Sequence, residues 1–148
     1  MHLPLVCVPL LLLVGCDWVS PSDGETVDAD FPDPSRWRLV QLAGAAVPDA
    51  APASLAFEDG AVSGVAACNR YGGDYAAGTG GALAVGPLYG TEIYCGDELY
   101  AFEGDYLRAL EAATEWDVDG ERLRLVAGDS ELVFVRVYEV EPSGGTGG

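Results

Sequence analysis

Between residues 37 and 137 the chain is made of short runs that mix apolar and polar residues, separated by turn signals. This pattern is typical of short antiparallel strands. Asp59-Gly60 and Asp119-Gly120 each lie between two such runs and are characteristic hairpin turns. The predicted strands are 37–42, 54–58, 61–65, 82–85, 114–118, 122–126 and 131–137. We therefore expect strands to dominate, in a mostly antiparallel sheet.

One segment, at about 97–112, has helical periodicity instead, with Asp97 as a suitable N-cap. Its apolar stripe consists of Leu99, Phe102, Tyr106, Leu107, Leu110 and Ala113. A helix with one apolar stripe must bury it, and the sheet is the available surface. The predicted fold class is α+β: a mostly antiparallel, strongly bent sheet or open barrel with one main helix packed on it. We expect the stripe to fill most of the interior, because a core of this size has little volume to spare.

The N-terminal segment has the pattern of a bacterial lipoprotein signal. An apolar run from Leu3 to Val14 is followed by Gly15 and Cys16, and the chain then turns polar. About 12 apolar residues are too few for a membrane span, which needs roughly 20, but they suit a cleaved signal. We predict a signal peptide at 1–15 and lipidation of Cys16. The alternative is an ordinary cleaved signal with Cys16 near the cut by chance, and the segment lacks the usual Lys or Arg. Cys7 is a poorer lipidation site, since bulky Val6 precedes it.

Composition divides the remaining chain into three parts. Residues 16–35 are acidic and rich in Pro, Ser and Asp, which predicts a flexible tether. Residues 139–148 form a Gly-rich tail, which is also expected to be flexible. A single domain at 36–138 lies between them.

The formal net charge of -17 restricts the partners. So acidic a surface repels phosphate backbones, which excludes nucleic acid. It also disfavours adsorption to anionic lipid, so the acyl chains on Cys16 would have to hold the protein at the membrane. The expected location is the cell envelope, on the outer side of the cytoplasmic membrane or on the outer membrane.

Catalytic side chains are scarce. The chain has no lysine, and its one histidine, His2, would leave with the signal. This excludes Ser-His-Asp and Cys-His catalysis, lysine Schiff bases and histidine-ligated zinc in the mature protein. Residues 117–121 faintly resemble a calcium loop but lack its spacing, and a hairpin turn explains them. We expect no enzyme activity, no catalytic residue, no metal site and no cofactor.

Once Cys16 is assigned to lipid, Cys68 and Cys95 remain as a pair within the domain. An exported protein meets an oxidising compartment, where such a pair can persist as a disulfide. Two free buried thiols are an alternative. A redox pair is a third, but there is no C-x-x-C spacing and Arg70 is the only basic neighbour. The structural disulfide is the favoured interpretation.

The order of several sequence stretches resembles that of the META domain, the fold of HslJ-type bacterial proteins. The matching stretches include W-R-L-V-Q-L from Trp37, V-S-G-V-A-A-C-N-R-Y-G-G-D-Y over 62–75 and L-Y-G-T-E-I-Y-C over 88–95. The resemblance implies an accessory role in heat-shock response or antibiotic tolerance. It supplies no catalytic residue.

The C-N-R-Y centre of that resemblance has two interpretations. Asn69, Arg70 and Thr91 either organise the backbone or line a small binding site, and nearby glycines at 64, 72 and 73 would permit bends or positive φ. The expected function is a non-catalytic accessory or binding role, with an unidentified envelope protein as partner. The alternative is a carrier of a small apolar ligand, which would require an apolar cavity between helix and sheet.

Overall fold

The computed structural model describes residues 30–138. The predicted signal peptide, Cys16, most of the predicted tether and the tail lie outside the described residues. The strands are β1 (Ser35–Leu42), β2 (Ala45–Ala46), β3 (Ser54–Glu58), β4 (Ala61–Ala66), β5 (Asn69–Ala77), β6 (Leu83–Val85), β7 (Tyr89–Gly90), β8 (Glu115–Asp119), β9 (Arg122–Ala127) and β10 (Ser130–Arg136). The helix is α1 (Asp97–Glu111), and a short 3₁₀ turn spans Thr79–Gly81.

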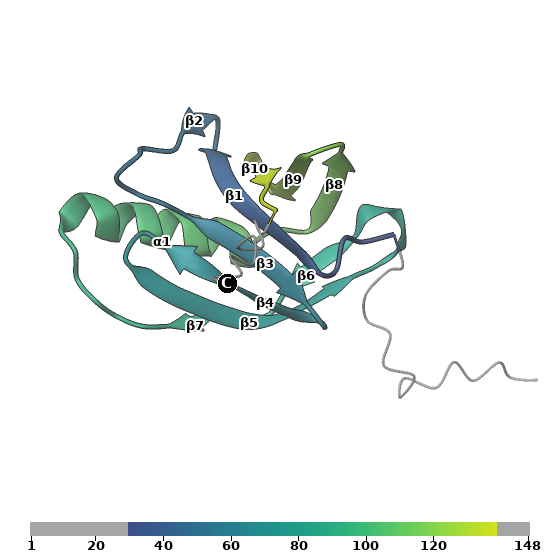
Figure 1. Ribbon diagram of the computed structural model, residues 1–148, viewed down its shortest axis with the longest axis horizontal. Coiled ribbons are helices and arrows are strands. Elements are labelled where there is room, and N and C mark those ends of the chain that lie inside the picture. The colour runs from purple at the N-terminus through teal and green to yellow at the C-terminus, as the bar shows by residue number, and fades with distance from the viewer. Residues whose placement is uncertain (1–29, 139–148) are drawn as a thin grey trace, which may run out of the picture.

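These strands form one antiparallel sheet that curls almost into a barrel (Figure 1). The strand order is β6-β5-β4-β3-β1-β10-β9-β8, with β2 paired to β1 and β7 paired to β5. The seam between β6 and β8 is held by a bridge between Ala82 and Glu115 and by a hydrogen bond of 2.9 Å from Leu83 N to Thr114 O. The predicted fold class is confirmed: the sheet is antiparallel and strongly bent, and a single helix packs on it.

Helix α1 packs on the concave side of the sheet, but only its second half seals the core. Tyr106 and Leu110 are fully buried, and Ala113 just beyond the helix is 2% exposed. Phe102 and Leu107 are partly buried against this core. Figure 1 shows the N-terminal end of α1 extending beyond the strands, so the predicted stripe is wrong at Leu99, which lies outside the core cluster.

The predicted N-cap is also shifted by one position. Gly96 is the N-cap, with φ 104°, and Asp97 is the first helical residue. Asp97 and Glu98 place negative charge in the first turn, which suits the positive end of the helix dipole. Within residues 30–138, no helix is long and apolar enough to cross a membrane.

The three glycines that could have permitted bends near the C-N-R-Y centre lie within strands: Gly64 in β4, and Gly72 and Gly73 in β5, the longest strand of the sheet. Gly64, Gly72 and Gly73 do not adopt the left-handed φ that bends would require. Their role is to let a neighbouring backbone segment or side chain come close to the strand. A Cβ on Gly64 would lie 2.0 Å from Ser54 O, and one on Gly73 would lie 2.9 Å from Pro87 O. The chain turns at Ala67 instead, which has φ 57°.

The folded part of the chain begins before the predicted boundary at residue 36. Phe31 is only 4% exposed. Its ring lies 4.8 Å from that of Phe57, 5.1 Å from that of Tyr75 and 5.0 Å from that of Trp116, between ring centroids. Asp33 accepts hydrogen bonds from Tyr75 Oη and from the backbone N–H groups of residues 59 and 60. The acidic, Pro-rich composition of this segment led to its assignment as tether. Residues 31–35 belong to the domain instead.

Candidate functional site

The segment 91–96, between β7 and α1, has no regular secondary structure and is held in place by one buried side chain, that of Asn69. Asn69 is 4% exposed. Its Nδ2 donates to Ile93 O at 2.9 Å and to Glu103 Oε2 at 2.7 Å. Its Oδ1 accepts from Thr91 Oγ1 at 2.8 Å and from Ile93 N at 2.7 Å. The amide thus uses both donors and both acceptor positions within the protein.

Thr91 and Arg70 extend this network along the edge of β5. Thr91 Oγ1 accepts from Arg70 N at 3.1 Å, and Thr91 N donates to Arg70 O at 3.0 Å. The structure therefore brings all three predicted residues together. Asn69 and Thr91 bond within the protein, while Arg70 contributes its backbone and extends an exposed side chain. Ligand contact by these residues stays a prediction, and the observed bonds give Asn69 and Thr91 a positioning role.

The disulfide joins the same two regions. Cys68 and Cys95 are bonded, with Cα atoms 6.5 Å apart. This places the covalent link beside Asn69 at one end and directly before α1 at the other. The structure thus contains the disulfide that the sequence favoured for these two cysteines. Segment 91–96 is fixed both by this disulfide and by the hydrogen bonds of the Asn69 amide.

Large apolar side chains gather on and beside this fixed segment. Tyr89, Ile93, Tyr94 and Tyr100 are 74%, 58%, 64% and 66% exposed, and they belong to one short stretch of sequence. The rings of Tyr94 and Tyr100 lie 6.1 Å apart. Single exposed apolar residues are ordinary, but a contiguous group marks an interaction surface.

A groove of about 680 Å³ lies between segment 91–96 and α1. We call it the tyrosine groove. Asn69 lies among its lining residues, Ile93 and Tyr94 line it from the segment, and Tyr100 and Leu107 line it from α1. The sequence interpretation missed Ile93, Tyr94 and Tyr100. One signal was available: Tyr100 is an aromatic residue outside the apolar stripe of an amphipathic helix.

Carboxylates line the groove and lie beside it. Glu92, Glu103 and Asp105 are among its lining residues. Asp97 and Glu98 stand in the first turn of α1. Tyr94 donates a hydrogen bond to Asp97, and this bond raises the pKa of the phenol above its usual 10.0. Arg108 forms an ion pair with Asp105. The site therefore presents exposed aromatic rings beside acidic side chains.

A second polar cluster lies inside the core. Tyr71 Oη is 2.7 Å from Tyr106 Oη and donates to Ser54 O at 2.6 Å. Burial raises the pKa of both phenols, so both stay neutral and neither is available as a base. The pair ties β5 to α1 and β3, and its bonds lie inside the fold.

The groups of the site divide into those that bond within the protein and those that are accessible. In the part of the chain that the structure describes, no group of three or more His, Cys, Asp and Glu residues could hold a metal ion. The buried polar groups of the site bond to one another, and the accessible groups are aromatic rings and carboxylates. Such surfaces recognise cations and apolar side chains.

Comparison with known proteins assigns the chain to a family. The META domain sequence profile matches residues 31–139. The chain belongs to the META domain family. The start of this match at residue 31 agrees with the burial of Phe31.

Solved structures share the fold. A protein from Burkholderia xenovorans, determined by NMR, is 32% identical, with a TM-score of 0.62 over 71% of this chain and 83% of that chain. A second NMR structure is 23% identical, with a TM-score of 0.57 over 70% of this chain and 89% of that chain. A crystal structure of a DUF4847 family protein from Bacteroides vulgatus is 14% identical, with a TM-score of 0.53 over 69% of this chain and 92% of that chain. The comparison with curated proteins finds no match.

Proposed function

We propose that this META-domain protein is a lipid-anchored, non-catalytic binding module of the cell envelope. The proposal rests on a contrast between the polar and the apolar side chains of the site. The polar side chains of Asn69 and Thr91 form hydrogen bonds with other groups of the protein, while large apolar side chains are exposed on the segment that they fix. This arrangement favours a role as a surface for a partner over a role as a reaction centre.

The anchor rests on the sequence before the domain. Leu13-Val14-Gly15-Cys16 supplies the apolar run, the small residue and the cysteine that lipoprotein processing requires. The acidic chain that follows would keep the domain away from anionic headgroups and leave its surface accessible.

Fractionation of cells that express the full chain tests the anchor. Cys16→Ser should move the protein from the membrane to the soluble fraction, and intact mass should show the loss of the acyl chains. Cys7→Ser is the matched control and should stay in the membrane fraction with its lipid. A Cys16→Ser protein that remains membrane-bound and uncleaved would contradict the proposal.

The resemblance to META-domain proteins supports a role in stress or antibiotic tolerance. A deletion strain complemented with wild-type protein or with Cys16→Ser tests this role. Heat or drug tolerance restored by wild type alone would support an anchored function. Equal survival of all three strains under these stresses would argue against it.

One observation favours the alternative, a carrier of a small apolar ligand. A cleft of about 470 Å³ lies between α1 and the β1–β2 hairpin, within the size range of ligand sites. Leu42, Val47, Phe102 and Ala109 line it, and Asp105 and Arg108 lie at its rim. The cleft opens to the surface, whereas the core beneath it is filled by Tyr106 and Leu110.

Titration with 1-N-phenylnaphthylamine tests the carrier. The carrier role requires the fluorophore to bind the wild-type protein and Ala109→Trp to block that binding by filling the cleft. Tyr138→Ala is the control outside the cleft. Absence of binding, or binding that Ala109→Trp leaves unchanged, would exclude the carrier role of this cleft.

A further inference from the structure

We infer that the tyrosine groove binds a basic segment of a partner protein, in which Arg or Lys alternates with polar and apolar residues. The inference rests on the proposed binding role and names its surface and the chemistry of its partner.

Segment 91–96 is preorganised for binding. A segment without regular structure normally loses conformational entropy when it binds. Here the disulfide and the hydrogen bonds of Asn69 have already fixed Ile93 and Tyr94 in place. A partner would therefore meet a rigid surface and avoid much of that cost.

The exposed side chains of the groove suit a cationic partner. Tyr94 and Tyr100 present large, amphipathic rings with little conformational freedom, as tyrosines at the centre of protein interfaces do. Guanidinium and ammonium groups bind the faces of such rings. The adjoining Ile93 and Leu107 accept the apolar part of a partner side chain.

The charge of the groove selects among possible occupants. Glu92, Glu103 and Asp105 line the groove, and Asp97 accepts a hydrogen bond from Tyr94. The basic residue in the lining, Arg108, is paired with Asp105. A second copy of this chain would bring a net charge of -17 to the same surface, and the chain's own residues 17–35 are also acidic. Both occupants are disfavoured by repulsion, whereas a basic segment is attracted.

A peptide titration tests the inference. The acylated full-length protein in a neutral detergent is titrated into a fluorescein-labelled peptide, Arg-Leu-Arg-Ser-Arg-Leu-Arg, and anisotropy is measured against empty micelles. The wild-type protein should bind this peptide, and added salt should weaken binding. Peptides with every Arg replaced by Gln or by Glu should not bind.

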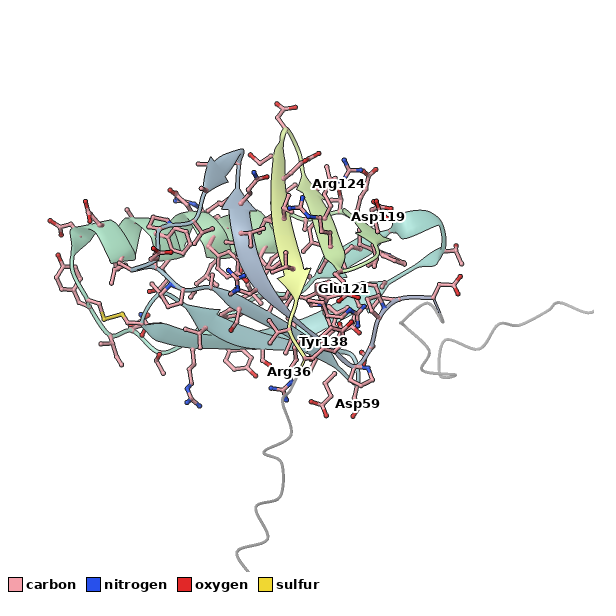
Figure 2. All side chains as sticks on the ribbon, turned by 45° about the horizontal axis from the view of Figure 1, so that its top comes forward. Arg36, Asp59, Asp119, Glu121, Arg124 and Tyr138 are labelled. Carbon is pink, nitrogen blue, oxygen red and sulfur yellow. A yellow bond between two sulfur atoms is a disulfide. The ribbon has the colours of Figure 1, made fainter. Side chains whose placement is uncertain are left out.

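Matched variants locate the binding. Tyr94→Ala combined with Tyr100→Ala should raise Kd at least ~10-fold, as loss of interface tyrosines does. Glu92→Gln should also raise Kd, because Glu92 lines the groove. Tyr138→Ala and Asp119→Asn are the controls and should keep wild-type Kd, because Figure 2 shows both residues far from the disulfide end of the domain. Circular dichroism should be unchanged in all variants, since these side chains are exposed.

Several outcomes would overturn the inference. Equal loss of affinity in the groove variants and the controls would mean diffuse attraction to an acidic protein. Tight binding of the Gln peptide would mean a purely apolar site. A dimer that the Tyr94→Ala, Tyr100→Ala variant abolishes would mean that a second copy fills the groove.

The proposed anchor and the proposed groove binding can be disproved independently of each other. If acylated protein does not bind the peptide, the groove inference is wrong and the anchored binding role stands. If Cys16→Ser leaves the protein in the membrane, the proposed anchor is wrong whatever the peptide does.

Discussion

Phe31→Ala should destabilise the domain strongly, although the residue lies in a segment whose composition is typical of a flexible tether. Its ring is 4% exposed and touches three other aromatic rings. Truncation of a buried Phe costs about 3–5 kcal/mol, from lost transfer free energy and the cavity left behind. This is a large share of the roughly 5–15 kcal/mol by which a domain is stable. The melting temperature should fall by at least about 12 °C, at roughly 4 °C per kcal/mol.

Equilibrium unfolding of the full chain in guanidinium chloride, followed by tryptophan fluorescence, measures this change. Trp116 contacts Phe31 and so reports on the site itself. Tyr89→Ala is the control: Tyr89 is 74% exposed, and its loss should change the free energy of unfolding by no more than about 0.5 kcal/mol. A change below about 1 kcal/mol for Phe31→Ala would refute the conclusion that Phe31 belongs to the core and residues 31–35 to the domain.

Three further predictions concern other parts of the domain. Gly64→Ala should destabilise it, because the new Cβ would lie 2.0 Å from Ser54 O, whereas Gly104→Ala in open space on α1 should stabilise it by up to about 1 kcal/mol; similar melting temperatures for the two variants would contradict this. Hydrogen bonds from Tyr75 and two backbone N–H groups outweigh burial and lower the pKa of Asp33 from its usual 3.8. The stability contributed by Asp33 is thus present above that value and lost as pH falls below it, so urea unfolding at pH 6 and pH 3 should show the advantage of wild type over Asp33→Asn shrinking in acid; a constant difference would be inconsistent with this. Cys95→Ser should cost roughly 3–4 kcal/mol, and dithiothreitol should destabilise wild type similarly but leave the variant unchanged; a wild type insensitive to reduction would argue against the disulfide.

Local patterns predicted most of the regular structure. Strand β3 has the predicted bounds, and β4, β6, β8, β9 and β10 agree with their predictions to within a residue or two. The Asp59-Gly60 turn has positive φ at both residues, as its sequence indicates. The second turn is shifted by one residue: Asp119 ends β8, and Gly120 carries the positive φ. These features depend on neighbouring residues, so the sequence alone reveals them.

The longest strand was missed because its glycines have low strand propensity. In β5, neighbouring groups leave little room for a side chain at Gly72 and Gly73. The ring of Tyr89 lies over Gly72, and the carbonyl of Pro87 lies against Gly73. No local pattern carries that information, since the partners come from a later part of the chain.

By itself, the sequence determined the antiparallel sheet, the amphipathic helix, the META resemblance and the pairing of Cys68 with Cys95 as the favoured alternative. Only the tertiary structure showed that Phe31 lies in the core, that Asn69 forms hydrogen bonds with segment 91–96, and that Tyr94 and Tyr100 line the same groove. The physical reason is the range of the interactions. Periodicity and turn chemistry act over a few residues, whereas burial, amide satisfaction and surface grouping depend on residues that become neighbours only when the sheet closes around the helix.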